Sequence, residues 1–131
     1  MDGLRTWIEI DKRALHHNVG RFLKLIPERT QLMAVVKSNA YGHGLTQVAL
    51  QFANSKFEIR NSKPIWFGVD SIVEALTLRR EGIKNPILVF GSTLSVRFAQ
   101  AASEDVIVTI SNFESLVALA KEKKPPVFHL A

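Results

Sequence analysis

Residues 32–44 read Leu-Met-Ala-Val-Val-Lys-Ser-Asn-Ala-Tyr-Gly-His-Gly. The run Leu32–Val36 is short, apolar on both faces and rich in β-branched residues, which is typical of a parallel strand covered on both sides. A loop, residues 38–44, follows this strand. From Leu45 a helix is predicted, because apolar residues recur on one side of it. This unit of strand, loop and helix is the pattern to look for in the rest of the chain.

The same pattern recurs after residue 64. Short apolar runs predict buried strands at residues 65–69, 87–90 and 106–110, each followed by a helical pattern, and a fifth run covers residues 127–130. The strand starts lie about 20 residues apart, a compact period that favours right-handed crossovers between parallel strands of one sheet. The sequence therefore predicts an α/β fold.

Two parallel architectures fit this alternation. A doubly wound dinucleotide fold places a Gly-x-Gly-x-x-Gly turn after its first strand, and the turn that begins at Lys37 lacks that fingerprint. A (β/α)8 barrel needs eight units and roughly 250 residues. A barrel interpretation therefore makes this chain a part of one, about the first five strands, ending before closure.

The helix nearest the N-terminus is predicted from its cap and its period. Asp11 can cap it after the alternating stretch 7–10, and Pro27 marks its end. Its apolar positions follow the spacing of one buried face: Leu15, Val19, Phe22, Leu23 and Ile26.

Later helices carry their own start and stop signals. Ser71 with Glu74, and Ser111 with Glu114, form Ser-x-x-Glu capping boxes in which the glutamate reaches back to the cap. Gly82 ends the third helix in a left-handed conformation. Ser92 and Thr93 are interpreted first as the start of a helix and only second as an anion contact.

Composition bounds the class of protein. The chain has 131 residues, 17 Lys and Arg, 12 Asp and Glu, and no cysteine. We expect one domain over residues 1–131, in which the polar decapeptide 54–63 is a surface insertion or, equally well, a helix end with its loop. The apolar runs are too short to span a membrane, and no secretory signal is recognised, so the cytoplasm is expected. The basic residues are scattered, which argues against nucleic-acid binding.

Lys37 follows the strand 32–36 directly, at the edge of a parallel sheet where ligands bind. Partial removal from water disfavours the ammonium and makes the neutral amine available to an aldehyde, as in a Schiff base. The alternative is a lysine that merely reaches solvent at a strand end.

The residues after Lys37 favour the chemical interpretation. Gly42 and Gly44 flank His43, and their backbone amides can approach an anion without a Cβ in the way. Tyr41 adds a hydroxyl group. A lysine for an aldehyde, with a tyrosine and amides for an anionic group, matches the two ends of pyridoxal phosphate, although a tight strand-to-helix turn explains the glycines equally well.

The segment Ala34–Gly44 resembles the pyridoxal-phosphate lysine motif of the alanine racemase family at every residue except Ser38, where alanine is usual. Trp-Ile-Glu-Ile-Asp at residues 7–11 resembles the family's opening strand and the start of its first helix. Residues 67–79, Phe-Gly-Val-Asp-Ser-Ile-Val-Glu-Ala-Leu-Thr-Leu-Arg, resemble its second strand and helix, and residues 86–91 its next strand. The resemblance covers nearly the whole chain outside the decapeptide.

The resemblance implies a (β/α)8 barrel, pyridoxal 5'-phosphate as cofactor, alanine as substrate, a homodimer, and D-alanine supply for peptidoglycan. Lys37 would join the cofactor and act as a base on the α-carbon, and Tyr41 would bind the cofactor phosphate. The family's second acid/base is a tyrosine from a partner subunit, whereas Tyr41 is the single tyrosine of this sequence. We therefore expect the 131-residue chain alone to be inactive or nearly so.

Two positions depart from the family pattern. Phe90 stands where a smaller aliphatic residue usually meets the cofactor, so its ring would crowd or stack on the pyridine. Ala131 stands where a lysine is common. An alternative function is therefore a non-catalytic module that binds pyridoxal phosphate or completes a barrel with a second polypeptide.

The remaining polar candidates are expected to be structural. His129 lies in an apolar run and is interpreted as a core residue, and His16 and His17 have no partner at metal-ligand spacing, so no metal site is predicted. The pair of Asp70 and Glu74 could suggest acid/base chemistry, but a capping role for Glu74 explains it better.

Overall fold

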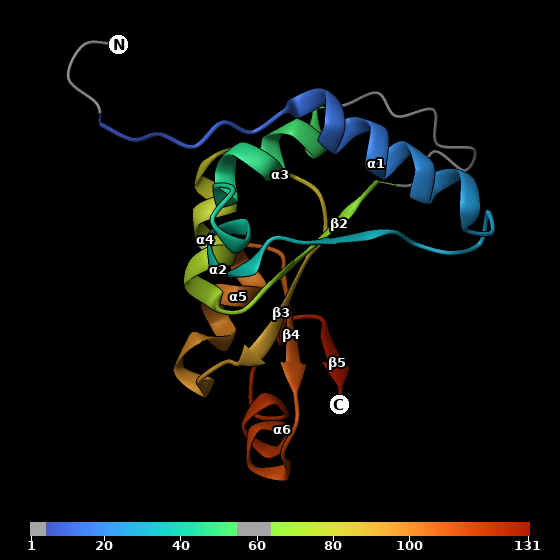
Figure 1. Cartoon of the computed structure of the whole chain (residues 1–131). Coiled ribbons are helices and arrows are strands. Elements are labelled where there is room, and N and C mark those ends of the chain that lie inside the picture. Colours follow the sequence, from blue (N-terminus) through green and yellow to red (C-terminus); the bar gives the residue numbers. More distant parts are fainter. Residues whose placement is uncertain (1–4, 55–63) are drawn as a thin grey trace.

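The computed structural model describes residues 5–54 and 64–131, and its centre is a five-stranded parallel sheet in the order β1-β2-β3-β4-β5 (Figure 1). The strands are β1 (Met33–Val35), β2 (Trp66–Val69), β3 (Ile87–Ser92), β4 (Val106–Ile110) and β5 (Phe128–Leu130). The predicted strands and their parallel crossovers are thus confirmed, within a few residues at each end. Apart from Asn54, the decapeptide 54–63 lies outside the described residues.

Helices follow the strands as the alternation predicts. They are α1 (Lys12–Leu25), α2 (Lys37–Tyr41), α3 (Leu45–Ala53), α4 (Ile72–Arg80), the 3-10 turn η1 (Ser95–Arg97), α5 (Phe98–Ser103) and α6 (Phe113–Leu119). Ser92 still belongs to β3, and the first helical turn after it starts only at Ser95, so the predicted helix start at Ser92 and Thr93 is wrong.

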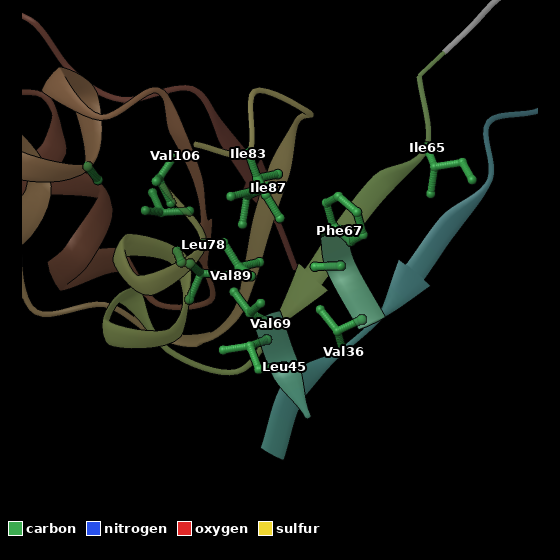
Figure 2. Packing of buried hydrophobic residues seen from close by; sticks show 14 of the residues in the cluster. Val36, Leu45, Ile65, Phe67, Val69, Leu78, Ile83, Ile87, Val89 and Val106 are labelled. Atoms are coloured by element: carbon green, nitrogen blue, oxygen red, sulfur yellow. The ribbon is translucent and has the colours of Figure 1, made fainter. Parts of the chain in front are cut away.

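The core lies between the sheet and the helices on its outer face. Strand residues on this face, among them Phe67, Ile87, Val89 and Val108, are fully buried. They belong to one cluster with Leu78 of α4, and Figure 2 shows Val89 close to Leu78. Burial of such side chains contributes roughly 1.5–3 kcal/mol each, which makes this layer the main source of stability.

The opposite, inner face of the sheet is concave. Trp66 on β2 and His129 on β5 have ring centroids only 6.4 Å apart, although two strands lie between them. In a flat sheet three strand spacings of about 4.8 Å would separate such rings by about 14 Å. The sheet therefore curls toward this face, as the first strands of a barrel do.

The inner face is also less covered than the sequence predicts. Val35 is 41% exposed and Phe90 is 39% exposed, although Leu88 on the same face of β3 is buried, so the inner face is uncovered near the carboxyl ends of these strands. The interpretation of His129 as a core residue is wrong for the same reason: its register partner is Thr109, which places it on the inner face, and it is exposed. All three residues of β5 are exposed, because β5 is an edge strand of this sheet, and the apolar run around the histidine concealed this.

Helix α1 begins as predicted, because the Asp11 side chain accepts hydrogen bonds from the Arg13 and Ala14 amides. Its apolar face is only partly covered: no α1 residue is buried, and Phe22 is exposed. A groove of about 440 Å³ separates α1 from β1 and α3. The alternating stretch 7–10 forms no strand, so the expected opening strand is not part of this sheet.

Of the capping predictions, those for Ser71 and Gly82 are confirmed and the one for Ser111 is wrong. The Ser71 hydroxyl oxygen accepts from the Glu74 amide, as predicted, and Gly82 has φ +82 after the end of α4. The Ser111 box is wrong: Asn112 caps α6, and its side chain accepts from the Ser115 amide. Asparagine and serine are nearly equal caps, so adjacent candidates cannot be ranked by residue type.

The amino edge of the sheet is tied together by Arg79 at the end of α4. Its guanidinium donates to four backbone carbonyls, those of Ile83, Asn85, Glu104 and Asp105, at 2.7–2.9 Å. Burial lowers the pKa of Arg79, while the charges of Asp105 and Glu104 act in the opposite direction. One side chain thus joins the loop before β3 to the loop before β4.

Candidate functional site

Lys37, Asp70 and Phe90 lie at one level of the sheet, beyond the carboxyl ends of β1 and β2 and near the end of β3. The register pairs Val35 with Gly68 and Gly68 with Leu88. Each of the three residues stands two positions after a member of that row. Phe90 lies within β3, so alternation places its side chain on the inner face, while Lys37 and Asp70 follow the ends of β1 and β2. The carboxyl edge of a parallel barrel is where ligands bind.

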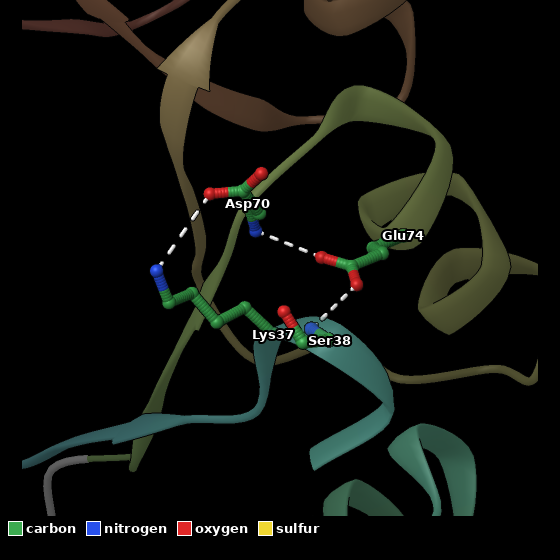
Figure 3. A network of polar contacts seen from close by, with 4 residues as sticks. All are labelled: Lys37, Ser38, Asp70 and Glu74. Atoms are coloured by element: carbon green, nitrogen blue, oxygen red, sulfur yellow. Dashed lines mark hydrogen bonds and ion pairs between the residues drawn. The ribbon is translucent and has the colours of Figure 1, made fainter. Parts of the chain in front are cut away.

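The Lys37 amine meets a carboxylate at this edge. Its Nζ lies 3.8 Å from Oδ1 of Asp70, with side chains 36% and 60% exposed (Figure 3). Lys37 is therefore neither buried in the core nor extended freely into water. The sequence singled out Asp70 only as a possible acid/base partner of Glu74 and did not predict its pairing with the lysine.

Glu74 contacts both neighbours of the amine. One carboxylate oxygen accepts from the Ser38 amide at 2.7 Å, and the other accepts from the Asp70 amide at 2.8 Å (Figure 3). The capping box predicted a bond back to Ser71. The carboxylate instead bonds to the amide before the cap and to the turn that follows Lys37.

That turn has an unusual backbone. Ser38, Asn39, Ala40 and Tyr41 all have φ between 51° and 57°, so α2 contains a left-handed turn where the sequence predicted a loop. Each such residue costs roughly 1–2 kcal/mol relative to a right-handed conformation. Strain of this kind persists only where surrounding contacts determine it, and it concentrates at functional sites.

The contacts that hold the turn come from both of its ends. The Ala40 amide donates to the Val36 carbonyl at 2.8 Å, and Ala40 is buried. Asn39 accepts three times: from the Gly42 and Gly44 amides on its carbonyl, at 3.1 and 2.9 Å, and from the Leu45 amide on its side chain, at 2.9 Å. The start of α3 is thereby fastened to the turn.

The two glycines after the turn also have positive φ, +90 at Gly42 and +93 at Gly44. A Cβ at Gly42 would meet nothing within 4 Å, so this glycine is required by its backbone and not by crowding. The Tyr41 side chain is 63% exposed. Its hydroxyl is accessible to a ligand at this edge.

Phe90 lies across the inner face of β2. A Cβ built on Gly68 would stand 2.5 Å from Cζ of Phe90 and 3.0 Å from Sδ of Met33. The missing side chain at Gly68 therefore makes room for the ring. The exposed part of the Phe90 side chain is a flat apolar surface at the level of Lys37.

The described residues contain no group of three or more histidine, cysteine, aspartate or glutamate side chains that could hold a metal ion. Within those same residues, no helix is long and apolar enough to cross a membrane.

The donor set fits pyridoxal phosphate. An amine at the sheet edge can join an aldehyde, an aromatic surface at the same level can face a pyridine ring, and an exposed hydroxyl can meet a phosphate. The curved parallel sheet and the lysine at its edge define the chain as part of a (β/α)8 barrel with a site at the carboxyl ends of its strands.

The chain belongs to the alanine racemase family, because the family described as "Alanine racemase, N-terminal domain" matches residues 10–131. The alanine racemase of Geobacillus kaustophilus is 40% identical over 128 residues, which cover 95% of this chain and 32% of that protein. The chain spans about a third of the length of the curated relatives it matches.

Solved structures agree on the fold. An alanine racemase from Clostridium difficile in complex with cycloserine superimposes with a TM-score of 0.80 at 25% identity, over 99% of this chain and 34% of that one. The alanine racemase from Bacillus anthracis with bound L-Ala-P gives 0.77 at 32% identity, over 95% of this chain and 31% of that one. The prediction of a partial barrel, about its first five strands, is confirmed.

Proposed function

We propose that the chain is the cofactor-binding, lysine-bearing part of an alanine racemase that interconverts L- and D-alanine with pyridoxal 5'-phosphate. The observation that carries this proposal is the position of the Lys37 amine. It lies at the carboxyl edge of the sheet, partly exposed, 3.8 Å from Asp70, and directly before a strained turn rich in backbone amides. Family membership supports the reaction class.

Each site residue has a proposed role. The Lys37 amine would hold the cofactor through its aldehyde, and as a free amine it would remove or return the proton at the substrate α-carbon. The Tyr41 hydroxyl donates to the cofactor phosphate. Phe90 stacks on the pyridine ring and excludes water from one side of it. The bound cofactor supplies delocalisation of the electron pair left when that proton departs.

The second acid/base group has to come from elsewhere. Tyr41 is the single tyrosine of the sequence and is assigned to the phosphate. We therefore propose that residues 1–131 form one incomplete barrel domain, and that a homodimer of the longer protein completes the site for alanine. Its product would serve peptidoglycan synthesis. The cytoplasmic location expected from the sequence stays a prediction.

A second candidate is a non-catalytic module that binds pyridoxal phosphate or completes a barrel with another polypeptide. The exposed apolar residues of the inner face favour it, since Val35 and Phe90 offer a surface that further strands can cover. A racemase and a cofactor-binding module both require Lys37 to bind the cofactor, whereas a module that only completes a barrel does not. We expect no racemisation by the 131-residue chain; activity that Lys37→Ala abolishes would contradict this expectation.

Cofactor binding can be tested on the chain itself. Incubation with pyridoxal phosphate is expected to give a visible absorption band, and borohydride reduction should fix the label on the peptide that contains Lys37. Lys37→Arg should remove this label, whereas Lys84→Arg, at an exposed site before β3, should keep it. Labelling spread evenly over the lysines, or absent from Lys37, would refute the assignment.

A further inference from the structure

We propose that Glu74 is a positioning residue for Lys37, and that its carboxylate holds the strained turn after the lysine in place. This inference rests on the proposed function, because it assigns Glu74 a task in cofactor capture. Glu74 lies in the first turn of α4, outside the motif that identifies the lysine. Its role is visible only once the two loops are seen side by side (Figure 3).

The carboxylate joins the two residues that flank the amine in space. Ser38 follows Lys37 in the chain, and Asp70 is its ion-pair partner. Their amides donate to different oxygens of the same carboxylate, at 2.7 and 2.8 Å. Hydrogen bonds from N–H groups to a carboxylate are about twice as strong as neutral ones, so this link is a firm one. The Glu74 carboxylate thus fixes the backbone next to Lys37 relative to the backbone of Asp70.

The Ser38 amide belongs to the first residue of the left-handed turn. Four successive residues with side chains adopt a conformation that each disfavours, and Ser38 is the first of them, with φ 53° and ψ 49°. If the acceptor at Glu74 is lost, the first strained residue loses the bond that offsets its strain. The turn then relaxes toward ordinary conformations, which changes the directions of Lys37 and Tyr41.

The chemistry of the contact requires a carboxylate. Two N–H donors converge on one side-chain group, and a carboxylate presents an acceptor oxygen to each. A glutamine of the same shape presents one oxygen and one NH2 group, and its NH2 group would face an amide donor. Glu74→Gln therefore keeps one bond and sets a donor against a donor in place of the other, without changing the volume of the side chain.

The first measurement needs no cofactor. Amide hydrogen exchange in the 131-residue chain should become at least tenfold faster at Ser38 or Asp70 in Glu74→Gln, and the exchange of β3 and β4 amides should stay as in the wild type. Glu114→Gln is the matched control, because Glu114 also lies in the first turn of a helix but on α6. It should leave both amides unchanged.

The second measurement separates positioning from stability. The rate at which pyridoxal phosphate and borohydride label Lys37, per folded molecule, should fall about fivefold in Glu74→Gln. Ser38→Gly added to that variant should restore much of the rate, because glycine adopts positive φ without the Cβ penalty. If Glu74 only stabilised the fold, Glu74→Gln would leave the labelling rate per folded molecule unchanged, and the added Ser38→Gly would have no loss to restore.

The outcomes separate the two proposals. A wild-type chain that takes no label on Lys37 would overturn the proposed function and this inference together. A labelled wild type with equal labelling in Glu74→Gln would overturn the inference alone. Unchanged exchange at both Ser38 and Asp70 would also overturn it, because the carboxylate would then hold nothing.

Discussion

Helix α4 reaches both edges of the sheet, and the two edges are held by opposite chemistry. At the carboxyl edge, Glu74 in its first turn accepts from two backbone amides. At the amino edge, Arg79 in its last turn donates to four backbone carbonyls. In a parallel α/β fold, helix N-termini bring unpaired N–H groups to one edge and helix C-termini bring unpaired carbonyls to the other. The carboxyl edge therefore requires a negatively charged acceptor, and the amino edge requires a positively charged donor.

The two edges also differ in strain and exposure. The carboxyl edge carries four left-handed non-glycine residues in succession and a partly exposed amine, whereas the described part of the amino edge has one such non-glycine residue, Asp105. The comparison teaches that one edge stores strain beside a reactive group and the other contributes stability. This division agrees with the general behaviour of barrels, in which chemistry collects at the carboxyl ends of the strands.

The largest effect is expected from Arg79→Ala. It leaves four carbonyls at the amino edge without their donor, and we expect a loss of about 3 kcal/mol in the free energy of unfolding by urea. Arg80→Ala is the control on the same helix, since Arg80 only reaches the exposed Thr77 hydroxyl, and should cost below about 0.5 kcal/mol. A similar small cost for both would remove the distinction between the edges.

Gly68→Ala tests the inner face at the site. The new Cβ would stand 2.5 Å from the Phe90 ring, which has to move, and overpacking of this kind costs about 1–3 kcal/mol. Urea unfolding measures the loss. Phe90→Leu in the same chain should recover at least half of it, because the shorter side chain leaves room for the Cβ. Additive costs in the double variant would show that the two residues do not touch.

A smaller effect of opposite sign is expected where glycine replaces a left-handed residue. Ser38→Gly at the carboxyl edge and Asp105→Gly at the amino edge should each stabilise the chain by about 0.5–1 kcal/mol, as relief of strain exceeds the added chain entropy. Thermal or urea unfolding tests both. Destabilisation by Ser38→Gly alone would mean that its side chain is needed at the site.

The smallest effect is expected from Asp70→Asn. The ion pair with Lys37 is long and its carboxylate is 60% exposed, so its loss should change the free energy of unfolding by less than about 0.5 kcal/mol. The Asp70 amide keeps its bond to Glu74. Unfolding at low and high salt checks this prediction, because an exposed pair is screened by salt. A cost above about 1 kcal/mol would place Asp70 among the structural residues of the edge.

The strands were predictable because their signal is strong. Apolar β-branched runs at a regular spacing predicted five parallel strands, the family resemblance implied their barrel arrangement, and one motif located Lys37. The left-handed turn was not predictable, because Ser38, Asn39, Ala40 and Tyr41 have no intrinsic preference for positive φ strong enough to outweigh its cost. Only the acceptors supplied by distant residues stabilise it.

The same limit explains the other differences at the site. Glu74 was recognised as a helix-start residue, but the sequence does not show that Ser38 lies within reach of its carboxylate. Phe90 was predicted to face a cofactor, and the glycine that accommodates its ring lies on a neighbouring strand. Contacts between strands follow from register, which one sequence does not specify.

The contact between the Trp66 and His129 rings across the concave face gives the protein an intrinsic fluorescence signal for the curvature of its sheet. Trp66 and His129 approach only when β2 and β5 bend toward each other, and an imidazole close to an indole quenches its emission. Replacing the exposed Trp7 would leave Trp66 as the fluorophore. Its emission would then decrease as the sheet becomes more curved and increase as the sheet flattens. The curvature of an open barrel could then be followed in real time without any added dye.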